Sequence, residues 1–325
     1  MLSFIIANHS SKRHAQYKKF LNDCHYKDKT VDDIVKLGYK LMRKSWLHPH
    51  YFGNNSLMET AQYLAFYSLQ LPYDYNNETY TGMILNESQA QKIISLFEKR
   101  ISKRIPVEYI TNEAQYSGFK FYVNENVLIP RSLMNARFND FLKHIYWTNY
   151  RVLDLCSGSG CIGITLALLK SNIRVDLLDI SEKALDVAKI NIERHRLQNR
   201  VKCIQGDLFE NIDEKYDLII SNPPYVSTKE YEKSPKEFKQ EPRIALEASQ
   251  DGLEIIAQII EEAKNHLNRE GTLIVEVGYS LLRRIKKRYS KASFKWFKYK
   301  NHLGKESYFG KPCIFTCLAR NLPLA

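Results

Sequence analysis

The chain has 325 residues, of which 44% are hydrophobic and 26% are charged, and its formal net charge is +12. This composition is ordinary for a globular protein, and the length suggests one large domain or two. No apolar run reaches the roughly 18 residues of a membrane helix. The short apolar patch Leu2 to Ala7, with no basic stretch before it, does not resemble a signal peptide. We therefore exclude a membrane protein and expect a cytoplasmic one.

The first third of the chain predicts an N-terminal extension followed by a small helical domain. Residues 1–28 have no clear periodicity, whereas residues 29–105 contain three segments with helical hydrophobic spacing. The three segments begin with residues that commonly cap helices, namely Thr30 with Asp33, Ser56 with Glu59, and Asn86.

The middle of the chain changes from helical to β character. Residues 106–130 are rich in aromatic and β-branched side chains, with Ser117 and Gly118 as a turn, and they predict a β-hairpin that links two domains. Across residues 131–325, predicted strands alternate with predicted helices. This alternation is typical of an α/β domain with a doubly wound, mostly parallel sheet.

The six cysteines form neither a CxxC pair nor a zinc-type spacing, and they lie at positions 24, 156, 161, 203, 313 and 317. We expect buried free thiols in a reducing cytoplasm, with a metal site as the alternative. Cys313 and Cys317 have even spacing, which puts them on one face of a predicted strand near 310–318. We predict that the protein binds no metal.

A basic segment lies near the C-terminus, from Arg283 to Lys305, with ten basic residues and no acidic residue. Five aromatic residues are interleaved with them, namely Tyr289, Phe294, Trp296, Phe297 and Tyr299. One interpretation is a solvated helix face followed by a half-buried strand. The other is a surface for RNA phosphates, because lysine and arginine release counterions when they neutralise phosphates.

The stretch VLDLCSGSGCIGI leads from a predicted strand into a predicted helix. Gly158 and Gly160 allow a tight turn that brings the backbone close to a ligand, and the helix presents free N–H groups at its start. Asp179 ends the next predicted strand, 19 residues after Gly160. A carboxylate at this place can accept hydrogen bonds from both ribose hydroxyls of a nucleoside.

Two classes of cofactor compete for this loop. Gly158, Gly160 and Gly163 spell the GxGxxG fingerprint of dinucleotide-binding enzymes, which would make the protein a dehydrogenase. Asp154 argues against it, because a carboxylate beside the loop repels a pyrophosphate, and no Tyr-x-x-x-Lys pair for a hydride site follows. S-adenosylmethionine carries a sulfonium cation, an amino-acid end and an adenosine, which would match Asp154, Asp179 and Asp207. A purely structural interpretation stays open, with Asp154 as a cap of the loop and Asp207 as a turn residue.

The stretch SNPPYVST (221–228) follows the apolar run KYDLII, which predicts a buried strand that ends at Ser221. Pro223 and Pro224 cannot donate to a sheet, and they hold Asn222 in an extended conformation. Ligands of open α/β sheets bind at the carboxyl ends of the strands, and we expect this strand to lie beside the first one. Asn222 would then face the cofactor. A plain turn without chemistry is the alternative.

SNPPYV resembles the (Asp/Asn/Ser)-Pro-Pro-(Tyr/Phe/Trp) motif of methyltransferases that modify planar amino nitrogens. The resemblance implies that the Asn222 side-chain oxygen and the Pro223 carbonyl accept the two hydrogens of a target –NH₂ group. It also implies that Tyr225 walls the pocket or stacks on the flat group. Such a nitrogen is a poor nucleophile because its lone pair is delocalised. Two fixed acceptors localise and aim the lone pair, so the reaction needs positioning more than a tuned base.

From about residue 30 to its end, the chain resembles the HemK/PrmC–PrmB family of protein-glutamine methyltransferases. The resemblance implies a helical domain that recognises the substrate, a hairpin linker, and a Rossmann-like class I S-adenosylmethionine-dependent domain with a seven-stranded, mostly parallel sheet. It rests on RIPVEYITNEAQYSGFKFYVNENVLIPRS (104–132), LDLCSGSGCIGI (153–164), SNPPYV (221–226), EPRIALEASQDGLEI (241–255) and LIVEVG (273–278).

The expected substrate follows from smaller differences within the family. Release-factor enzymes carry IPRPET after the hairpin, whereas this chain has Ile129-Pro130-Arg131-Ser132-Leu133-Met134. That departure, with YFGNNSLMETAQYLAFYSLQLP (51–72), resembles the PrmB branch, which methylates N5 of a glutamine in the third protein of the large (50S) ribosomal subunit. We also expect rRNA contact through Arg283–Lys305. A release-factor glutamine methyltransferase and an RNA or DNA amino methyltransferase are the alternatives.

The residues expected to bind the cofactor are carried over by position. The resemblance places the ribose on Asp179, and the methionine end on the loop residues Cys156, Ser157, Gly158, Ser159 and Gly160. Asp207 and Leu208 would bind the adenine. Release-factor enzymes tend to have Trp where Leu208 lies, so Leu208 or Phe209 would take over the adenine platform.

The residues expected to bind the substrate follow the fourth strand. The resemblance places the glutamine amide among Asn222, Pro223, Pro224 and Tyr225, with Asn222 also close to the cofactor. Glu241 and Pro242 mark a loop that is expected to close over the substrate. We expect the protein to be a monomer.

Overall fold

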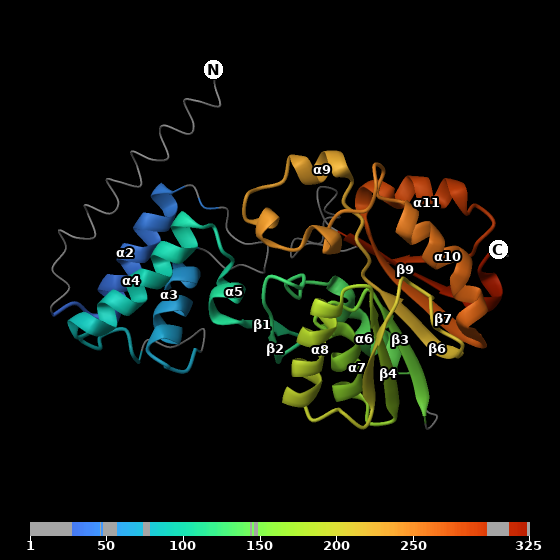
Figure 1. Ribbon diagram of the computed structural model, residues 1–325, viewed down its shortest axis with the longest axis horizontal. Helices are drawn as coiled ribbons and strands as arrows, with labels where there is room; N and C mark the ends of the chain where they lie inside the picture. The colour runs from blue at the N-terminus through green and yellow to red at the C-terminus, as the bar shows by residue number, and fades with distance from the viewer. Residues whose placement is uncertain are drawn as a thin grey trace, which may run out of the picture. The chain divides into compact units, whose positions relative to one another are not determined.

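Figure 1 shows a computed structural model of the chain, which describes residues 28–45, 47, 57–73, 79–143, 145, 149–297 and 312–323. The chain divides into two compact units, Met1–Thr111 and Asn112–Ala325. The predicted N-terminal extension up to residue 27, Ser56, and the basic residues between 298 and 305 lie outside the described residues.

The first unit contains four described helices, which are α2 (Val31–Lys44), α3 (Leu57–Ser68), α4 (Glu87–Ser102) and the short α5 (Val107–Thr111). Two of the predicted helix starts are full capping boxes, formed by Thr30 with Asp33 and by Asn86 with Gln89. Helices α2, α3 and α4 bury one shared apolar core. The helical character predicted for this part of the chain is therefore confirmed.

The segment that follows α4 begins with a helix and not with a strand. The sequence predicted a hairpin from Pro106 onward, but Val107–Thr111 form α5, so the prediction is wrong for these residues. The Pro106 carbonyl accepts hydrogen bonds from the amides of Tyr109 (3.2 Å) and Ile110 (3.1 Å). These bonds close a helical turn that the β-branched and aromatic composition does not reveal.

The hairpin itself is shorter than predicted and has the predicted turn. It consists of β1 (Glu113–Tyr116) and β2 (Phe119–Tyr122), which pair antiparallel. Ser117 and Gly118 between them have positive φ values of 55° and 83°. Two consecutive residues in the left-handed region form the type of turn whose twist matches a two-residue hairpin.

The second unit is built around a seven-stranded sheet with the strand order β5-β4-β3-β6-β7-β9-β8. Figure 1 labels β4, β3, β6, β7 and β9 of this sheet. The strands from β5 to β7 are parallel, and β9 is antiparallel to both of its neighbours. Strand β6 pairs with β3, as predicted, with Ser221 opposite Leu155. The strands are β3 (Tyr150–Leu155), β4 (Ile173–Asp179), β5 (Val201–Gln205), β6 (Tyr216–Ser221), β7 (Leu267–Gly278), β8 (Lys295–Phe297) and β9 (Pro312–Leu318).

Helices cover both faces of the sheet. Neighbouring residues of a strand point to opposite faces. Leu153 and Ile219 belong to the apolar core that includes α10, whereas Val152 and Ile220 belong to the core that includes α7 and α8. This arrangement confirms the predicted doubly wound α/β fold. The helices of this unit are α6 (Phe138–Leu142), α7 (Cys161–Leu169), α8 (Glu182–Arg194), α9 (Thr228–Glu232), α10 (Glu254–His266) and α11 (Leu282–Arg288), with short 3₁₀ turns at Leu133–Arg137, Phe238–Gln240, Arg243–Ala245, Tyr279–Leu281 and Ala319–Asn321.

The cysteines of the described part of the chain are free thiols, and Cys24 lies outside that part. Cys313 and Cys317 are buried on β9, as their spacing predicted. Among the described residues, no group of three histidine, cysteine, aspartate or glutamate side chains is arranged to hold a metal ion. No helix within the described ranges is long and apolar enough to cross a membrane.

Candidate active site

A tight loop leaves the carboxyl end of β3 and enters α7. Its backbone has positive φ at Cys156 (56°), Gly158 (54°) and Gly160 (75°), the conformation that glycine adopts most readily. At Gly160 an added Cβ would lie 2.7 Å from the side chain of Leu177 in β4. The loop can turn this closely over β4 because Gly160 has no side chain.

One buried amide holds this loop from the side. Asn191 of α8 donates from Nδ2 to the carbonyl oxygens of Ser159 and of Tyr122 in β2, both at 3.0 Å. Its Oδ1 accepts a hydrogen bond of 2.6 Å from the Tyr122 amide. Ser159, one of the residues predicted to bind the cofactor, is therefore held through its carbonyl.

Asp154 lies beneath the loop and is completely buried. Its Oδ2 accepts a hydrogen bond of 2.8 Å from the amide of Gly163, and its Oδ1 has no partner within the described ranges. Burial raises the pKa of this carboxyl to about 7, against the lowering effect of the Gly163 amide. An added Cβ at Gly163 would lie 3.0 Å from Oδ2. Such a Cβ would lie even closer to Leu177 (2.6 Å) and Val175 (2.7 Å) of β4, so the third glycine of the apparent dinucleotide fingerprint serves close packing of α7 on β4 and on Asp154.

Asp179 ends β4, as predicted, and its carboxylate touches the loop. Oδ2 accepts a hydrogen bond from the Gly158 amide at 2.8 Å, and Oδ1 accepts one from the Ser181 amide at 2.9 Å. Burial raises the pKa of Asp179, and the two amides oppose that rise. Each carboxylate oxygen can accept more than one hydrogen bond, so Asp179 can still accept ribose hydroxyls.

A cleft of about 360 Å³ opens beside the end of β5, lined by Ile180, Gln205, Gly206, Asp207, Glu210 and Asn211. Asp207, which was predicted to bind adenine, is part of this lining. Leu208 and Phe209 are not, because both are buried in the core, where the Phe209 ring stacks on His266 with centroids 4.6 Å apart. The exposed Ile180 is an apolar side chain of the lining that sequence reasoning missed. Its position directly after Asp179 could have pointed to it.

The NPPY stretch begins where β6 ends, beside the end of β3. The Ser221 hydroxyl donates a hydrogen bond of 2.8 Å to the Leu155 carbonyl. The Asn222 Oδ1 atom is buried and accepts no hydrogen bond from any described residue. Pro223 is buried and Pro224 is half-buried. A buried oxygen left without a donor costs about 1–3 kcal/mol, and a bound molecule with an N–H or O–H group could supply the donor that Asn222 Oδ1 lacks.

Three buried oxygens at these two strand ends lack a partner in the part of the chain that the structure describes. They are Asp154 Oδ1, Ser157 Oγ and Asn222 Oδ1. Two of them can only accept hydrogen bonds, and the Asp154 carboxyl can carry a negative charge. Such a set suits a ligand with N–H donors and a positive charge. S-adenosylmethionine has both, whereas a dinucleotide would bring an anionic pyrophosphate to the same place.

The backbones of two glycines lie close to Tyr225. An added Cβ at Gly278 would lie 3.1 Å from the Tyr225 ring, and one at Gly252 would lie 2.6 Å from the Tyr225 carbonyl oxygen. Burial raises the pKa of Tyr225 above its ordinary value, so the hydroxyl stays protonated. The ring has the fixed position that a pocket wall requires.

The Glu241 carboxylate is buried, and both of its oxygens accept hydrogen bonds within the protein. Its two oxygens accept hydrogen bonds of 2.7 and 2.6 Å from Arg131 Nη1, and Oε2 also accepts one of 3.1 Å from the Ile129 amide. The side chain of Glu241 is fully buried and that of Arg131 is 16% exposed. Sequence reasoning expected Glu241 beside the substrate and overlooked Arg131 as its partner.

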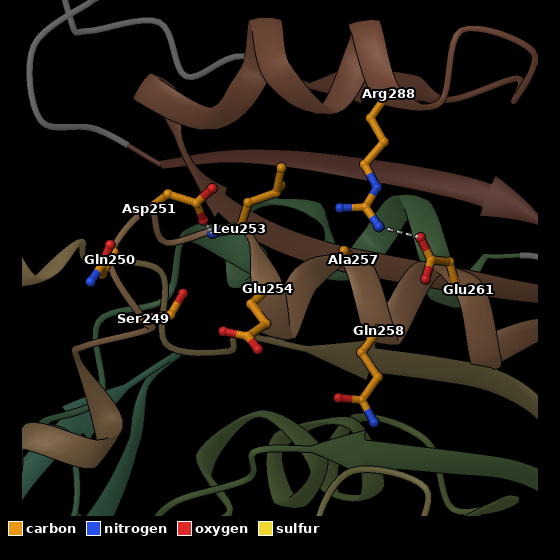
Figure 2. A pocket seen from close by; sticks show the side chains of 9 residues that line it. All are labelled: Ser249, Gln250, Asp251, Leu253, Glu254, Ala257, Gln258, Glu261 and Arg288. Atoms are coloured by element: carbon orange, nitrogen blue, oxygen red, sulfur yellow. Dashed lines mark hydrogen bonds and ion pairs between the residues drawn. The ribbon is translucent and has the colours of Figure 1, made fainter.

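Part of the basic segment faces acidic side chains. A cleft of about 560 Å³ lies beside α10 and α11. In it Arg288 of α11 forms an ion pair of 2.9 Å with Glu261 of α10, which Figure 2 marks by a dashed line. Arg284 pairs with Asp251. The lining comprises Ser249, Gln250, Asp251, Leu253, Glu254, Ala257, Gln258, Glu261 and Arg288. Two of the basic residues counted in the sequence are therefore neutralised within the protein.

Known proteins resemble this chain along most of its length. The family described as "Methyltransferase small domain" matches residues 138–286. The ribosomal protein uL3 glutamine methyltransferase of Neisseria meningitidis serogroup B is 36% identical over 258 residues, which cover 77% of this chain and 83% of that protein. The uL3 glutamine methyltransferase of Francisella tularensis subsp. tularensis is 39% identical over 233 residues, which cover 70% of this chain and 74% of that protein.

A solved structure shows the same fold. The hMettl16 catalytic domain, in complex with MAT2A 3′UTR hairpin 6, has a TM-score of 0.50 at 13% identity. The match covers 81% of this chain and 95% of that one. The identity is too low to carry more than the fold. The family is identified by the sequence relatives. This chain is a methyltransferase that belongs to the family of ribosomal protein uL3 glutamine methyltransferases.

Proposed function

We propose that this protein transfers a methyl group from S-adenosylmethionine to the side-chain amide nitrogen, N5, of a glutamine in ribosomal protein uL3, the third protein of the large subunit. The observation that carries the proposal is the buried, unpaired Asn222 Oδ1 at the end of β6. A substrate amide N–H is the donor that this oxygen lacks. The names of the relatives favour uL3 over a release factor or a nucleic acid, and membership of a methyltransferase family disfavours a dehydrogenase.

The acceptor pocket works by holding two hydrogens. A glutamine amide nitrogen has two N–H bonds, and its lone pair is delocalised into the carbonyl group. Asn222 Oδ1 would accept one N–H and the Pro223 carbonyl the other, so that the lone pair is localised and aimed. Pro223 and Pro224 fix the two acceptors because their φ angles are locked. The bond from Ser221 to Leu155 keeps the end of β6 in place.

The residues around the loop fit the cofactor. When bound, S-adenosylmethionine supplies an electrophilic methyl group on its sulfonium sulfur. Asp179 would bind its ribose hydroxyls, the loop Cys156–Gly160 its methionine end, and Asp207 with Ile180 its adenine. Asp154 holds the start of α7 through Gly163 and has a second oxygen available for an ammonium group.

Two further parts of the chain would contact the substrate. The helical residues 29–105 would recognise uL3. Helix α11 would contact rRNA in a subunit that is being assembled, because its Arg283, Lys286 and Lys287 form no ion pair with a described acidic residue. Replacing Arg283 and Lys287 by glutamate reverses both charges. These substitutions should then slow methylation of subunit-bound uL3 and leave methylation of free uL3 unchanged.

The proposal is tested by methyl transfer from tritiated S-adenosylmethionine to isolated uL3, followed by mass spectrometry. We expect one methyl group on a glutamine side chain. Asn222→Ala should abolish the transfer with little loss of cofactor binding in calorimetry. Label found on a Gly-Gly-Gln loop of a release factor would contradict the uL3 substrate. Label that is removed by nuclease and survives protease would contradict every protein substrate.

A further inference from the structure

Tyr225 directly precedes the first of three segments of the second unit that lie far apart in sequence. They are the exit from the NPPY stretch (226–228), the loop 241–248, and the segment 129–133 that follows the hairpin. Hydrogen bonds join each segment to the next, and the last one returns to the strand that packs on the Tyr225 ring.

The first link joins the NPPY exit to the loop 241–248. The Val226 amide donates to the Leu246 carbonyl, and the Ala248 amide donates to the Val226 carbonyl, both at 2.9 Å. The Thr228 hydroxyl donates to Glu247 Oε1 at 2.6 Å. A turn of 3₁₀ helix carries the chain from this pairing back to Glu241.

The second link joins that loop to the segment 129–133 and is the ion pair of Glu241 with Arg131. Arg131 Nη1 donates to both carboxylate oxygens, and the Ile129 amide donates to one of them. Arg131 also lies over the Phe238 ring, with its guanidinium carbon 5.3 Å from the ring centroid. The pair is almost completely enclosed, so the loss of either charge would leave its partner buried without compensation.

The third link joins the segment 129–133 to β7. The Ser132 hydroxyl donates to Glu276 Oε2 at 2.7 Å, and the Leu133 amide donates to the same oxygen at 3.0 Å. Glu276 is buried, and two residues later Gly278 offers its bare backbone to the Tyr225 ring. The contacts therefore form a closed ring that includes Tyr225, and the two acceptors, on Asn222 and Pro223, lie three and two residues before it in the chain.

We infer that Arg131 and Glu241 are positioning residues whose ion pair closes this ring and so fixes Tyr225 beside the acceptor oxygens. The inference rests on the proposed methylation of an amide, because only such an acceptor pocket needs this precision. Neither residue touches the reacting atoms in this role. Opening the ring should let the stretch Asn222–Tyr225 move while the cofactor loop, which is held by Asn191 and Asp179, stays in place.

The test compares Glu241→Gln with Glu270→Gln, a matched control that breaks the exposed ion pair with Arg320 in the same unit. Glu241→Gln keeps the shape of the side chain and removes its charge. We expect kcat for uL3 to fall about 100-fold, as for a misplaced reacting group, while the Kd of S-adenosylmethionine stays within about twofold of the wild-type value. Glu241→Asp, which retains the charge, should recover part of kcat. Glu270→Gln should behave like the wild type.

A second measurement is independent of the substrate. Hydrogen–deuterium exchange of the peptide 222–228 should be faster in Glu241→Gln than in the wild type, and exchange of the cofactor loop should not change. Ser132→Ala removes one of the two hydrogen bonds of the third link and leaves the one from the Leu133 amide, so it weakens the ring and gives a milder form of the same test if Glu241→Gln does not fold. Unchanged exchange, or a loss of kcat that only parallels a loss of cofactor affinity, would overturn the inference. A wild-type enzyme that does not methylate uL3 would instead overturn the proposed function, and the exchange data would still decide on the ring.

Discussion

The Ser221 hydroxyl is bound to the Leu155 carbonyl at 2.8 Å, and this bond joins the ends of the two strands that carry the acceptor and the cofactor loop. Ser221→Ala removes the donor and leaves a buried carbonyl less well satisfied. We expect the free energy of unfolding to fall by about 1–2 kcal/mol, measured by urea denaturation. Ser290→Ala, at an exposed position of the same unit, should leave it unchanged. Equal stability of both variants would contradict a role for this bond.

Gly160 and Gly158 allow backbone strain to be separated from steric conflict. Both have positive φ, but an added Cβ would meet Leu177 at Gly160 and nothing within 4 Å at Gly158. Gly158→Ala should therefore destabilise the fold by about 1 kcal/mol through its backbone conformation alone. Gly160→Ala should have a clearly larger effect, because Leu177 must also move. Thermal denaturation of the two variants measures the difference. An equal loss of stability would mean that Leu177 can move aside at no energetic cost.

Stability should fall as pH rises through neutrality. Burial raises the pKa of Asp154 from 3.8 to about 7 and that of Glu276 from 4.5 to about 7. The folded state therefore binds more protons than the unfolded state between these values. The resulting stability is present below the ordinary pKa values and is lost as pH rises through 7.

Asp154→Asn isolates the contribution of the Asp154 carboxyl to the pH dependence of stability. The amide keeps an acceptor for Gly163 and cannot ionise. Between about pH 5 and pH 7, the slope of unfolding free energy against pH should become shallower by up to about 1.4 kcal/mol per pH unit. Urea denaturation at several pH values gives both curves. Parallel curves for the variant and the wild type would show that Asp154 does not titrate in this range.

Ile180 should contribute to cofactor affinity and little to stability. It is 49% exposed and lines the cleft beside Asp207. Ile180→Ser removes apolar contact area, and we expect the Kd of S-adenosylmethionine to rise about tenfold, which corresponds to about 1.4 kcal/mol. Ile190→Ser is the matched control, since Ile190 is 43% exposed on α8 and is not part of the cleft lining. Calorimetric titration of both variants tests the assignment, which an equal effect would contradict.

The sheet and the positions of the site segments were predictable because they depend on local signals. The apolar runs predicted the strands, and Ser117 with Gly118 predicted the turn. Asp179 was expected at the end of its strand. The exit at Ser221 was readable from the prolines that follow it. These features need only sequence spacing and the geometry of parallel sheets.

Other features depend on partners that spacing does not reveal. Glu241 pairs with Arg131, which lies 110 positions earlier in the chain. Because sequence spacing does not reveal this partner, the acidic residue suggested a free carboxylate near the substrate. Leu208 has a positive φ of 50°, and together with Phe209 it is buried in the core and not at the cleft. Val107–Thr111 has a strand-like composition but is closed into a helix by the Pro106 carbonyl.

Asn191 links two parts of the second unit directly through hydrogen bonds, in addition to the apolar core that the hairpin shares with α7. One side-chain amide bonds to the hairpin at Tyr122 and to the cofactor loop at Ser159. If cofactor binding shifts the Ser159 carbonyl, the hairpin must respond, and any protein that grips the hairpin must alter cofactor affinity by the same factor. Loading of the methyl donor and capture of the acceptor protein would then be thermodynamically coupled, with Asn191 as the residue whose side chain bonds to both parts.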